Sequence, residues 1–150
     1  MATLTATVTE SVTINGSVRG STNTITVDNI TNTFERVLTA AHSNTTTIAT
    51  FGSTPHSSAN ALDLENCKYI RISNISASAV MDLAIVTENT NYQVVMTAGF
   101  SHILCQADTA VIAEADTTPN FPTLEDVTSI QVKPRGAADD CEVEIFVGLL

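Results

Sequence analysis

The sequence predicts an all-β protein, an antiparallel β-sandwich of jelly-roll-like type with about nine short strands. Apolar residues alternate with β-branched polar residues in one run after another, which is the pattern of half-buried strands. Turn-forming residues separate these runs, and no segment keeps the apolar period of an amphipathic helix. Alternation alone does not separate a jelly roll from an immunoglobulin-like sandwich, so the order of the strands stays open.

The Thr-rich first part of the chain has the clearest alternation. Residues 3–9 read Thr-Leu-Thr-Ala-Thr-Val-Thr, and residues 11–14 continue the pattern. Asn15-Gly16 follows, and both residues accept the positive φ of a type I′ turn, so the sequence predicts a hairpin there. Further strands are expected at 22–27, 30–38 and 45–51.

The second part of the chain is richer in Ile and Val and follows a loop expected at 52–60. Residues 80–87 are almost continuously apolar, which is typical of a central strand buried on both faces. A second loop is expected at 116–122, and the best helical candidates, 36–41 and 124–126, are short. The remaining strands are expected at 67–75, 92–97, 100–105, 110–113, 127–133 and 141–147.

Aromatic residues and cysteines complete the expected core. Phe34, Phe51, Phe100 and Phe146 are expected to fill it, and Tyr92 is assigned to the core with a surface position as the alternative. The three cysteines are Cys67, Cys105 and Cys141. Their odd number and long spacing, without a Cys-x-x-Cys motif, predict free buried thiols, although a pair across neighbouring strands stays open.

Length and composition indicate one domain, residues 1–150, with residues 1–13 as a candidate extended N-terminal arm. The chain has 6 Lys and Arg against 16 Asp and Glu, a net charge of −10. The few basic residues are scattered, which argues against nucleic-acid binding through phosphate contacts. No apolar run approaches the length of a membrane span. The N-terminus also lacks the features of a signal peptide, so we expect folding in a cytosol.

The search for catalytic and metal-binding residues gives little. His42, His56 and His102 belong to no recognisable nucleophile–base motif, so we expect no enzyme activity and no cofactor. Asp139, Asp140, Glu142 and Glu144 form the one acidic cluster. A calcium site there is the weaker interpretation. A solvated strand face opposite Cys141, Val143, Ile145 and Val147 is the stronger one.

The expected surface and the two chain ends direct attention to assembly. The chain contains 24 Thr, 12 Ser and 11 Asn, and neutral hydrogen bonds between such side chains are less sensitive to salt than ion pairs. A strand-forming N-terminal arm could add to an exposed sheet edge of a neighbour. The apolar C-terminus would be costly to leave in water. The candidate interface residues are Thr3, Leu4, Thr5, Val8, Val12, Phe146, Val147, Leu149 and Leu150, with ordinary edge or core strands as the alternative.

Four segments carry a resemblance to a known class of protein. They are Cys67-Lys-Tyr-Ile-Arg-Ile-Ser-Asn-Ile75, the stretch that begins Gly99-Phe-Ser-His-Ile-Leu, Leu124-Glu-Asp-Val-Thr-Ser-Ile130 and Asp140-Cys-Glu-Val-Glu-Ile-Phe146. In this order they resemble small virion structural proteins of tailed bacteriophages, particularly of marine and cyanobacterial phages. The resemblance covers residues 65–150, and its motifs are β-sandwich patterns without catalytic content.

The resemblance implies a non-enzymatic role on the capsid or the tail. The expected function is a capsid decoration or cement protein that binds the major capsid protein or other virion proteins. We expect a homo-oligomer, a dimer or a trimer, located in the virion after synthesis in the bacterial host cytoplasm. A tail, collar or fibre component is the alternative within the same class. A carbohydrate-binding or adhesion module is the alternative from another class, and an exposed pair of Tyr69 and Tyr92 on one sheet face would favour it.

Overall fold

The computed structural model describes residues 1–54, 61–114 and 118–150, so the expected loops at 52–60 and 116–122 lie partly outside the described residues. Within these ranges the chain forms thirteen strands and no helix, which confirms the all-β prediction. The described residues therefore also contain no helix able to cross a membrane. The strands are β1 (Ala2–Thr9), β2 (Val12–Ile14), β3 (Ser17–Arg19), β4 (Thr22–Ile30), β5 (Asn32–Ala40), β6 (Thr46–Gly52), β7 (Ala61–Asp63), β8 (Cys67–Asn74), β9 (Met81–Val86), β10 (Asn91–Met96), β11 (Ser101–Leu104), β12 (Ser129–Pro134) and β13 (Cys141–Leu149).

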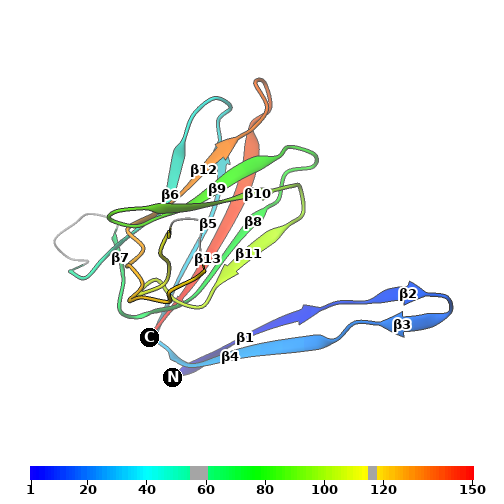
Figure 1. Ribbon diagram of the computed structural model, residues 1–150, viewed down its shortest axis with the longest axis horizontal. Coiled ribbons are helices and arrows are strands. Elements are labelled where there is room, and N and C mark those ends of the chain that lie inside the picture. The colour runs from blue at the N-terminus through cyan, green and yellow to red at the C-terminus, as the bar shows by residue number, and fades with distance from the viewer. Residues whose placement is uncertain (55–60, 115–117) are drawn as a thin grey trace.

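The strands from β5 onward form a two-layered sandwich (Figure 1). One sheet has the order β11-β8-β13-β5, and the other has the order β10-β9-β12-β6, with the short β7 added parallel to β6. If the eight antiparallel strands are numbered one to eight along the chain, the two sheets read 1-8-3-6 and 2-7-4-5. This is the strand order of a jelly roll, so the jelly-roll prediction is confirmed.

The core lies between the two sheets, and β13 shows how the sequence builds it. Cys141, Val143, Ile145 and Val147 are fully buried, while the residues between them face outward. The predicted alternation of this strand is confirmed. The partners of Ile145 and Val147 on β8 are Ile72 and Ile70, which are also fully buried.

Several local predictions were wrong. Residues 36–40 belong to β5, and Glu125 forms only an isolated bridge with Val111, so neither helical candidate nor the strand at 110–113 exists. The central strand β9 is buried on one face and only half-buried on the other, because none of the described strands forms a further layer over the outer face of its sheet.

The expected aromatic core is also only partly present. Phe51 is buried and Phe34 packs against the core. Phe146 lies on the outward side of β13, Tyr92 is exposed, and Phe100 is 65% exposed. Strand parity explains Phe146, since it follows the inward-facing Ile145 by one residue.

The first four strands leave the sandwich as a long β-ribbon, which we call the arm (residues 2–30; Figure 1). Its base is the antiparallel pair of β1 and β4, and its tip is the hairpin of β2 and β3. Asn15 and Gly16 have φ values of 51° and 78°, as a type I′ turn requires, so the predicted hairpin is confirmed. The expected arm, residues 1–13, is therefore only the outgoing half of the arm in the structure.

The two chain ends meet where the arm joins the sandwich (Figure 1). Ala2 pairs with Ile30 at the end of β4. The next residue, Thr31, donates its backbone N–H to the Leu149 carbonyl at 2.9 Å. The Leu150 N–H in turn donates to the Asn66 carbonyl at 2.9 Å, so both ends are held by backbone hydrogen bonds.

The cysteines are free, as expected for three thiols without a common spacing. Cys67 and Cys141 are buried, whereas Cys105 is exposed, so the prediction of buried thiols was wrong for Cys105. Burial raises the pKa of the Cys67 thiol to about 12. Burial also raises the pKa of Cys141, and both buried thiols are thereby kept protonated and unreactive at neutral pH.

Candidate functional site

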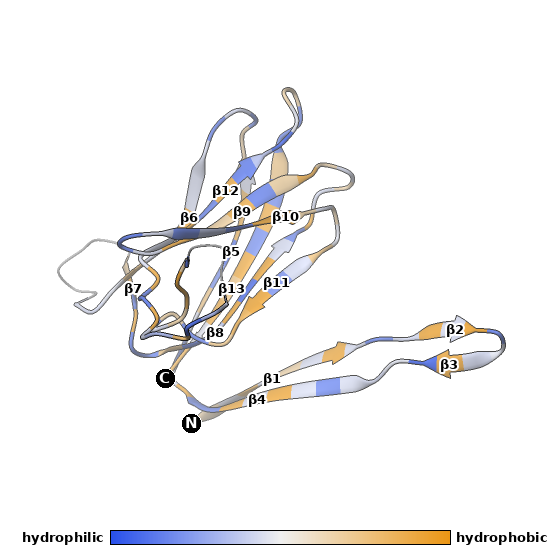
Figure 2. Cartoon of the chain, in the orientation of Figure 1, coloured by the Kyte–Doolittle hydropathy of each residue, from blue (hydrophilic) through white to orange (hydrophobic). Residues whose placement is uncertain are grey.

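The two faces of the arm differ in chemistry. The register pairs Leu4 with Val27 and Ala6 with Ile25, so one face carries an apolar stripe. The opposite face consists of threonine pairs, namely Thr5 with Thr26, Thr7 with Thr24 and Thr9 with Thr22. Figure 2 shows this alternation along β1 and β4. Exposing the apolar face of the ribbon to water is unfavourable, so we expect this face to pack against a protein surface.

A glycine on β13 lets the arm dock at its base. A Cβ atom at Gly148 would lie 2.9 Å from Leu4 Cδ1 and 3.3 Å from Ile30 Cδ1, so the glycine lets these two methyl groups approach the β13 backbone, and a side chain there would require them to shift. Tyr69, the partner of Gly148 on β8, is only 4% exposed beneath them. Thr3 also donates its hydroxyl to Asp28 Oδ1 at 3.0 Å across the ribbon. The base of the arm is therefore fixed on the outer face of the β11-β8-β13-β5 sheet.

Beyond this anchor the arm and the sheet diverge and leave an open wedge of about 860 Å³. On the arm side it is lined by all of residues 4–9 of β1 and by no residue of β4. Consecutive strand residues point to opposite faces. Because every residue from 4 to 9 lines the wedge, the edge of β1, and not one of its two faces, is turned toward it. On the sheet side the lining residues are Tyr69, Arg71, Gly99, Phe100, Ser101, Ile103 and Phe146.

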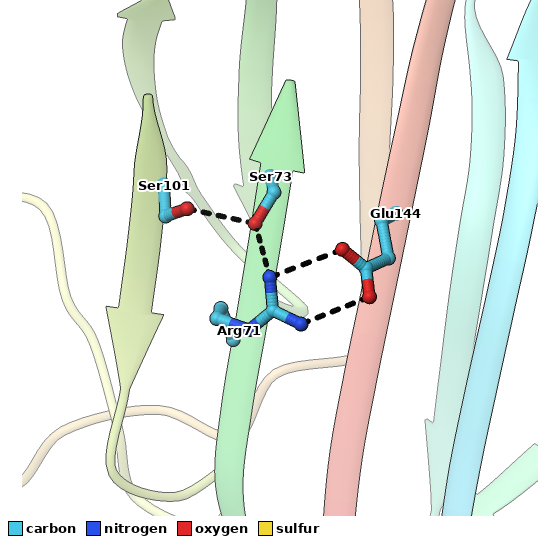
Figure 3. Close-up of polar contacts among 4 residues, drawn as sticks. All are labelled: Arg71, Ser73, Ser101 and Glu144. Atoms are coloured by element: carbon cyan, nitrogen blue, oxygen red, sulfur yellow. Dashed lines mark hydrogen bonds and ion pairs between the residues drawn. The ribbon is translucent and has the colours of Figure 1, made fainter. Parts of the chain in front are cut away.

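The polar floor of the wedge is a closed network across three strands (Figure 3). Arg71 donates from Nη2 to Glu144 Oε1 at 3.0 Å and from Nη1 to Oε2 at 3.2 Å. Arg71 Nη1 also donates to Ser73 Oγ, which is hydrogen-bonded to Ser101 Oγ at 2.7 Å. The hydrogen bonds to Glu144 raise the pKa of Arg71. Because Glu144 occupies the guanidinium with both of its oxygens, the network stiffens the floor and does not offer a free cation to an anionic ligand.

The structure places the candidate interface residues in two different environments. Thr3, Leu4, Thr5 and Val8 lie on β1, and Val12 lies on β2, so all five belong to the arm. Phe146 lines the wedge, where its ring meets that of Tyr69 edge-on at 6.2 Å. Val147 and Leu149 are buried in the sandwich, and Leu150 is partly exposed beside Asn66. Val147 and Leu149 are thus core residues, as the alternative interpretation held.

The candidate catalytic residues do not come together in the described part of the chain. His42 Nδ1 lies 2.8 Å from Asp140 Oδ1, and both side chains are about half exposed. The hydrogen bond from the His42 backbone N–H, followed by that of its ring, lowers the pKa of Asp140. Among the described residues the His42 ring is hydrogen-bonded only to this carboxylate, and no hydroxyl or thiol is hydrogen-bonded to the ring. His56 lies outside the described residues.

The acidic cluster is also divided between different partners. Glu144 holds Arg71, and Asp140 holds His42. In the ranges that the structure describes, no group of three or more His, Cys, Asp or Glu side chains is placed to hold a metal ion.

His102 points inward from the short edge strand β11, opposite the buried Ile72. Its ring lies 5.8 Å from that of Tyr92, and its Nε2 is buried without a hydrogen-bond partner in the described structure. Burial lowers the pKa of His102, because the cation would lose its hydration.

This depressed pKa predicts a pH dependence of stability. The unfolded chain takes up a proton at His102 more readily than the folded chain does. Stability is therefore complete above the unfolded pKa and declines as the pH falls below it. We expect urea unfolding midpoints to be lower at about pH 5.5 than at about pH 7.5, and His102→Leu to flatten that difference.

His42→Gln is the control for this prediction, since His42 follows β5, at the opposite edge of the same sheet, and its variant should keep the decline. The pKa values of Glu125 and Asp140 are lowered by their hydrogen bonds. Both carboxylates therefore titrate below the tested range. An unchanged pH dependence in His102→Leu would contradict the assignment.

Sequence reasoning missed half of the arm and its anchor. The run at 22–27 shows the same alternation as 3–9, and the Asn15-Gly16 turn between them was the signal that they pair. Gly20 was also missed: it has a φ of 126°, and a Cβ there would lie 2.0 Å from the Glu10 carbonyl oxygen. No local pattern marks Gly148, since its requirement comes from residues more than 100 positions away.

The candidate functional site is thus the arm together with the wedge at its base. Comparison of the chain with protein-family models and with curated proteins gives no match, so its function is argued from this geometry.

Proposed function

We propose that this chain is a virion structural protein of a tailed bacteriophage, and first of all a capsid decoration or cement protein that binds and stabilises the shell. The observation that carries the proposal is the arm, a two-stranded ribbon that projects from a jelly-roll sandwich (Figure 1). The resemblance of residues 65–150 to small phage virion proteins supports it from the sequence side.

The arm supports an assembly role because it contributes little to the sandwich of its own chain. A lone two-stranded hairpin is marginally stable in water, yet this one extends well beyond its anchor at Gly148 (Figure 2). Val12, Ile14 and Val18 at its tip are all exposed. Exposed apolar residues on a projecting element are typical of surfaces that pack against another protein.

The surface chemistry fits a partner in a permanent shell. Over β1 the arm presents only Ala, Thr, Leu and Val, so its contacts are hydroxyl hydrogen bonds and apolar packing. Such contacts are insensitive to ionic strength, unlike surface ion pairs. A specific interface needs about 1,200–2,000 Å² of buried surface, and a protein that bridges neighbouring capsomers gains further affinity from multivalency. The partners are the major capsid protein or other virion proteins, and the location is the virion.

The other candidate functions receive less support. A tail, collar or fibre component would use the same arm and is separated from decoration only by experiment. For a carbohydrate-binding module the favourable feature was an exposed pair of Tyr69 and Tyr92. Tyr69 is instead 4% exposed on β8, and Tyr92 lies on β10 of the other sheet. The ring of the exposed His42 is hydrogen-bonded only to Asp140 among the described residues, so this pair gives no support to an enzyme.

The proposal is tested by co-sedimentation of the purified chain with empty capsid shells of the phage that encodes it. We expect binding at a fixed ratio to capsomers and a higher temperature of shell disruption, with an unrelated acidic protein as the control. A chain that stays in the supernatant with shells but sediments with purified tails would replace decoration by the tail alternative. Binding to neither, together with binding in a glycan array, would overturn the virion role.

A further inference from the structure

We infer that β1 is the dimerisation strand of this protein, and that it pairs edge to edge with β1 of a second copy around a two-fold axis. The inference names the chain's own partner and does not depend on the virion role. The partner strand lies in the wedge, between the free edge of β1 and the outer face of the sheet.

β1 has a free edge. In the part of the chain that the structure describes, β1 pairs only with β4, so the backbone groups along its other edge form no strand-to-strand hydrogen bonds. That edge faces the wedge, since β1 residues alone line the arm side (Figure 1). Unpaired backbone N–H and C=O groups along an edge are a template for another strand.

β1 has few of the features that protect an edge strand. Natural edge strands are kept from pairing by charges, proline, bulges or short length. β1 is eight residues long and reads Ala-Thr-Leu-Thr-Ala-Thr-Val-Thr, with no charge and no proline, and its register irregularity lies at the base of the arm, between Ala2 and Leu4. By contrast, β4 carries Asp28, β5 carries Glu35 and Arg36, and β7 and β11 have three and four residues. β2 is uncharged but has only three residues, and the uncharged edge β10 has six residues and is approached by β11 through the contact between Tyr92 and His102.

β1 is complementary to a second copy of itself. Two antiparallel copies of one strand are related by a two-fold axis, so the same patch serves both sides. Register parity then decides which faces coincide, since a slip by one residue would place threonines on the apolar stripe. A two-fold axis at Ala6 sets Leu4 opposite Val8 of the second copy and Thr5 opposite its Thr7. The result is a four-stranded sheet, β4-β1-β1-β4, with one threonine face and one face that is apolar across both β1 strands and carries Asn23 on each β4.

The dimer buries the surface of both arms. Each arm is two strands wide, and its docked length is that of β1, about 26 Å. Two arms placed in each other's wedges, against Phe100, Ile103 and Phe146, bury two such docked lengths toward the roughly 1,200–2,000 Å² that a specific interface needs. One arm docked alone would bury only one such length, about half of the same area. The area therefore favours the reciprocal dimer.

The pairing also explains Phe100, which is 65% exposed in the single chain although it lies directly beside the wedge. In the dimer it faces the second copy's arm. A large aromatic side chain that becomes buried in an interface can contribute much of its binding energy.

Sedimentation analysis of the purified chain tests the inference. At about 50 μM, above the micromolar dissociation constants at the weak end of specific interfaces, we expect twice the chain mass of 15.8 kDa. Ala6→Lys sets two like charges opposite each other at the two-fold axis. It should raise the dissociation constant by about 100-fold or more. Thr24→Lys, on the threonine face of β4, is the matched control and should remain a dimer. A monomeric wild type, or an Ala6→Lys dimer of unchanged affinity, would overturn the inference.

Cross-linking tests the register even if Ala6→Lys disturbs the arm. In a Cys105→Ser background, Ala6→Cys should form a disulfide-linked dimer with diamide as the oxidant, because opposed residues of paired strands lie within disulfide reach. Thr24→Cys, on the outer strand of the four, should stay monomeric on a non-reducing gel. Cross-linking of Thr24→Cys without that of Ala6→Cys would contradict pairing through β1. Since these assays use no capsid shells, their failure can be told apart from a failure of the virion role.

Discussion

Ile145→Ala is expected to destabilise the protein by about 3–4 kcal/mol, a loss typical of a large aliphatic side chain removed from the centre of a core. Ile145 is fully buried on the central strand β13, and its partner on β8, Ile72, is fully buried as well. Removing three methyl or methylene groups there leaves a cavity between the sheets that neighbouring strands cannot close without breaking their ladders. For a domain of this size the melting temperature should fall by about 10 °C.

Urea unfolding followed by circular dichroism measures this change. The matched control is Val37→Ala on the neighbouring strand β5, because Val37 is 62% exposed. Its loss should fall within about 0.5 kcal/mol of the wild type. A loss below about 1 kcal/mol for Ile145→Ala would mean that the two sheets are not packed through β13.

Arg71→Met is expected to cost about 2 kcal/mol, between the values for exposed and for fully buried ion pairs. The arginine and Glu144 side chains are 28% and 23% exposed, so the carboxylate left behind is partly desolvated and loses both hydrogen bonds. Ser73 loses a donor in the same step. The effect should therefore exceed that of a surface ion pair.

The double variant Arg71→Met/Glu144→Met separates the pair from its surroundings. We expect it to recover most of the stability lost in Arg71→Met, since no unpaired charge remains and both new side chains can pack beside Phe146. The measurement is a double-mutant cycle by urea unfolding. A double variant as unstable as the sum of the two single variants would show that Arg71 and Glu144 contribute independently.

The sandwich was predictable from the sequence because its strands carry local signals. Residues 141–147 alternate so strictly that both the strand and its buried face follow from parity alone. Asn15-Gly16 likewise determines its own turn through two positive φ values. These are properties of neighbouring residues, and a single sequence contains them.

The wedge was not predictable in the same way because it depends on contacts between distant segments. Phe100 is a large apolar residue of the kind that fills cores. It is exposed because it lies in the turn between β10 and the short β11. Gly148 looks like any strand glycine until Leu4 and Ile30 are seen above it. The arm was expected to end at residue 13, although the hairpin predicted at Asn15-Gly16 is the local signal that would have paired 22–27 with 3–9.

The meeting of the two chain ends makes the polypeptide almost a closed loop. Ala2 is paired with Ile30, and Thr31 is hydrogen-bonded to Leu149, so a short linker could join the termini without moving a strand. New ends could then be opened between Asn15 and Gly16, at an exposed tip, where circular permutation is tolerated best. In such a permuted protein the two long strands of the ribbon would become separate tails. The connectivity of the chain could thus be changed while every pairing in the sandwich is retained.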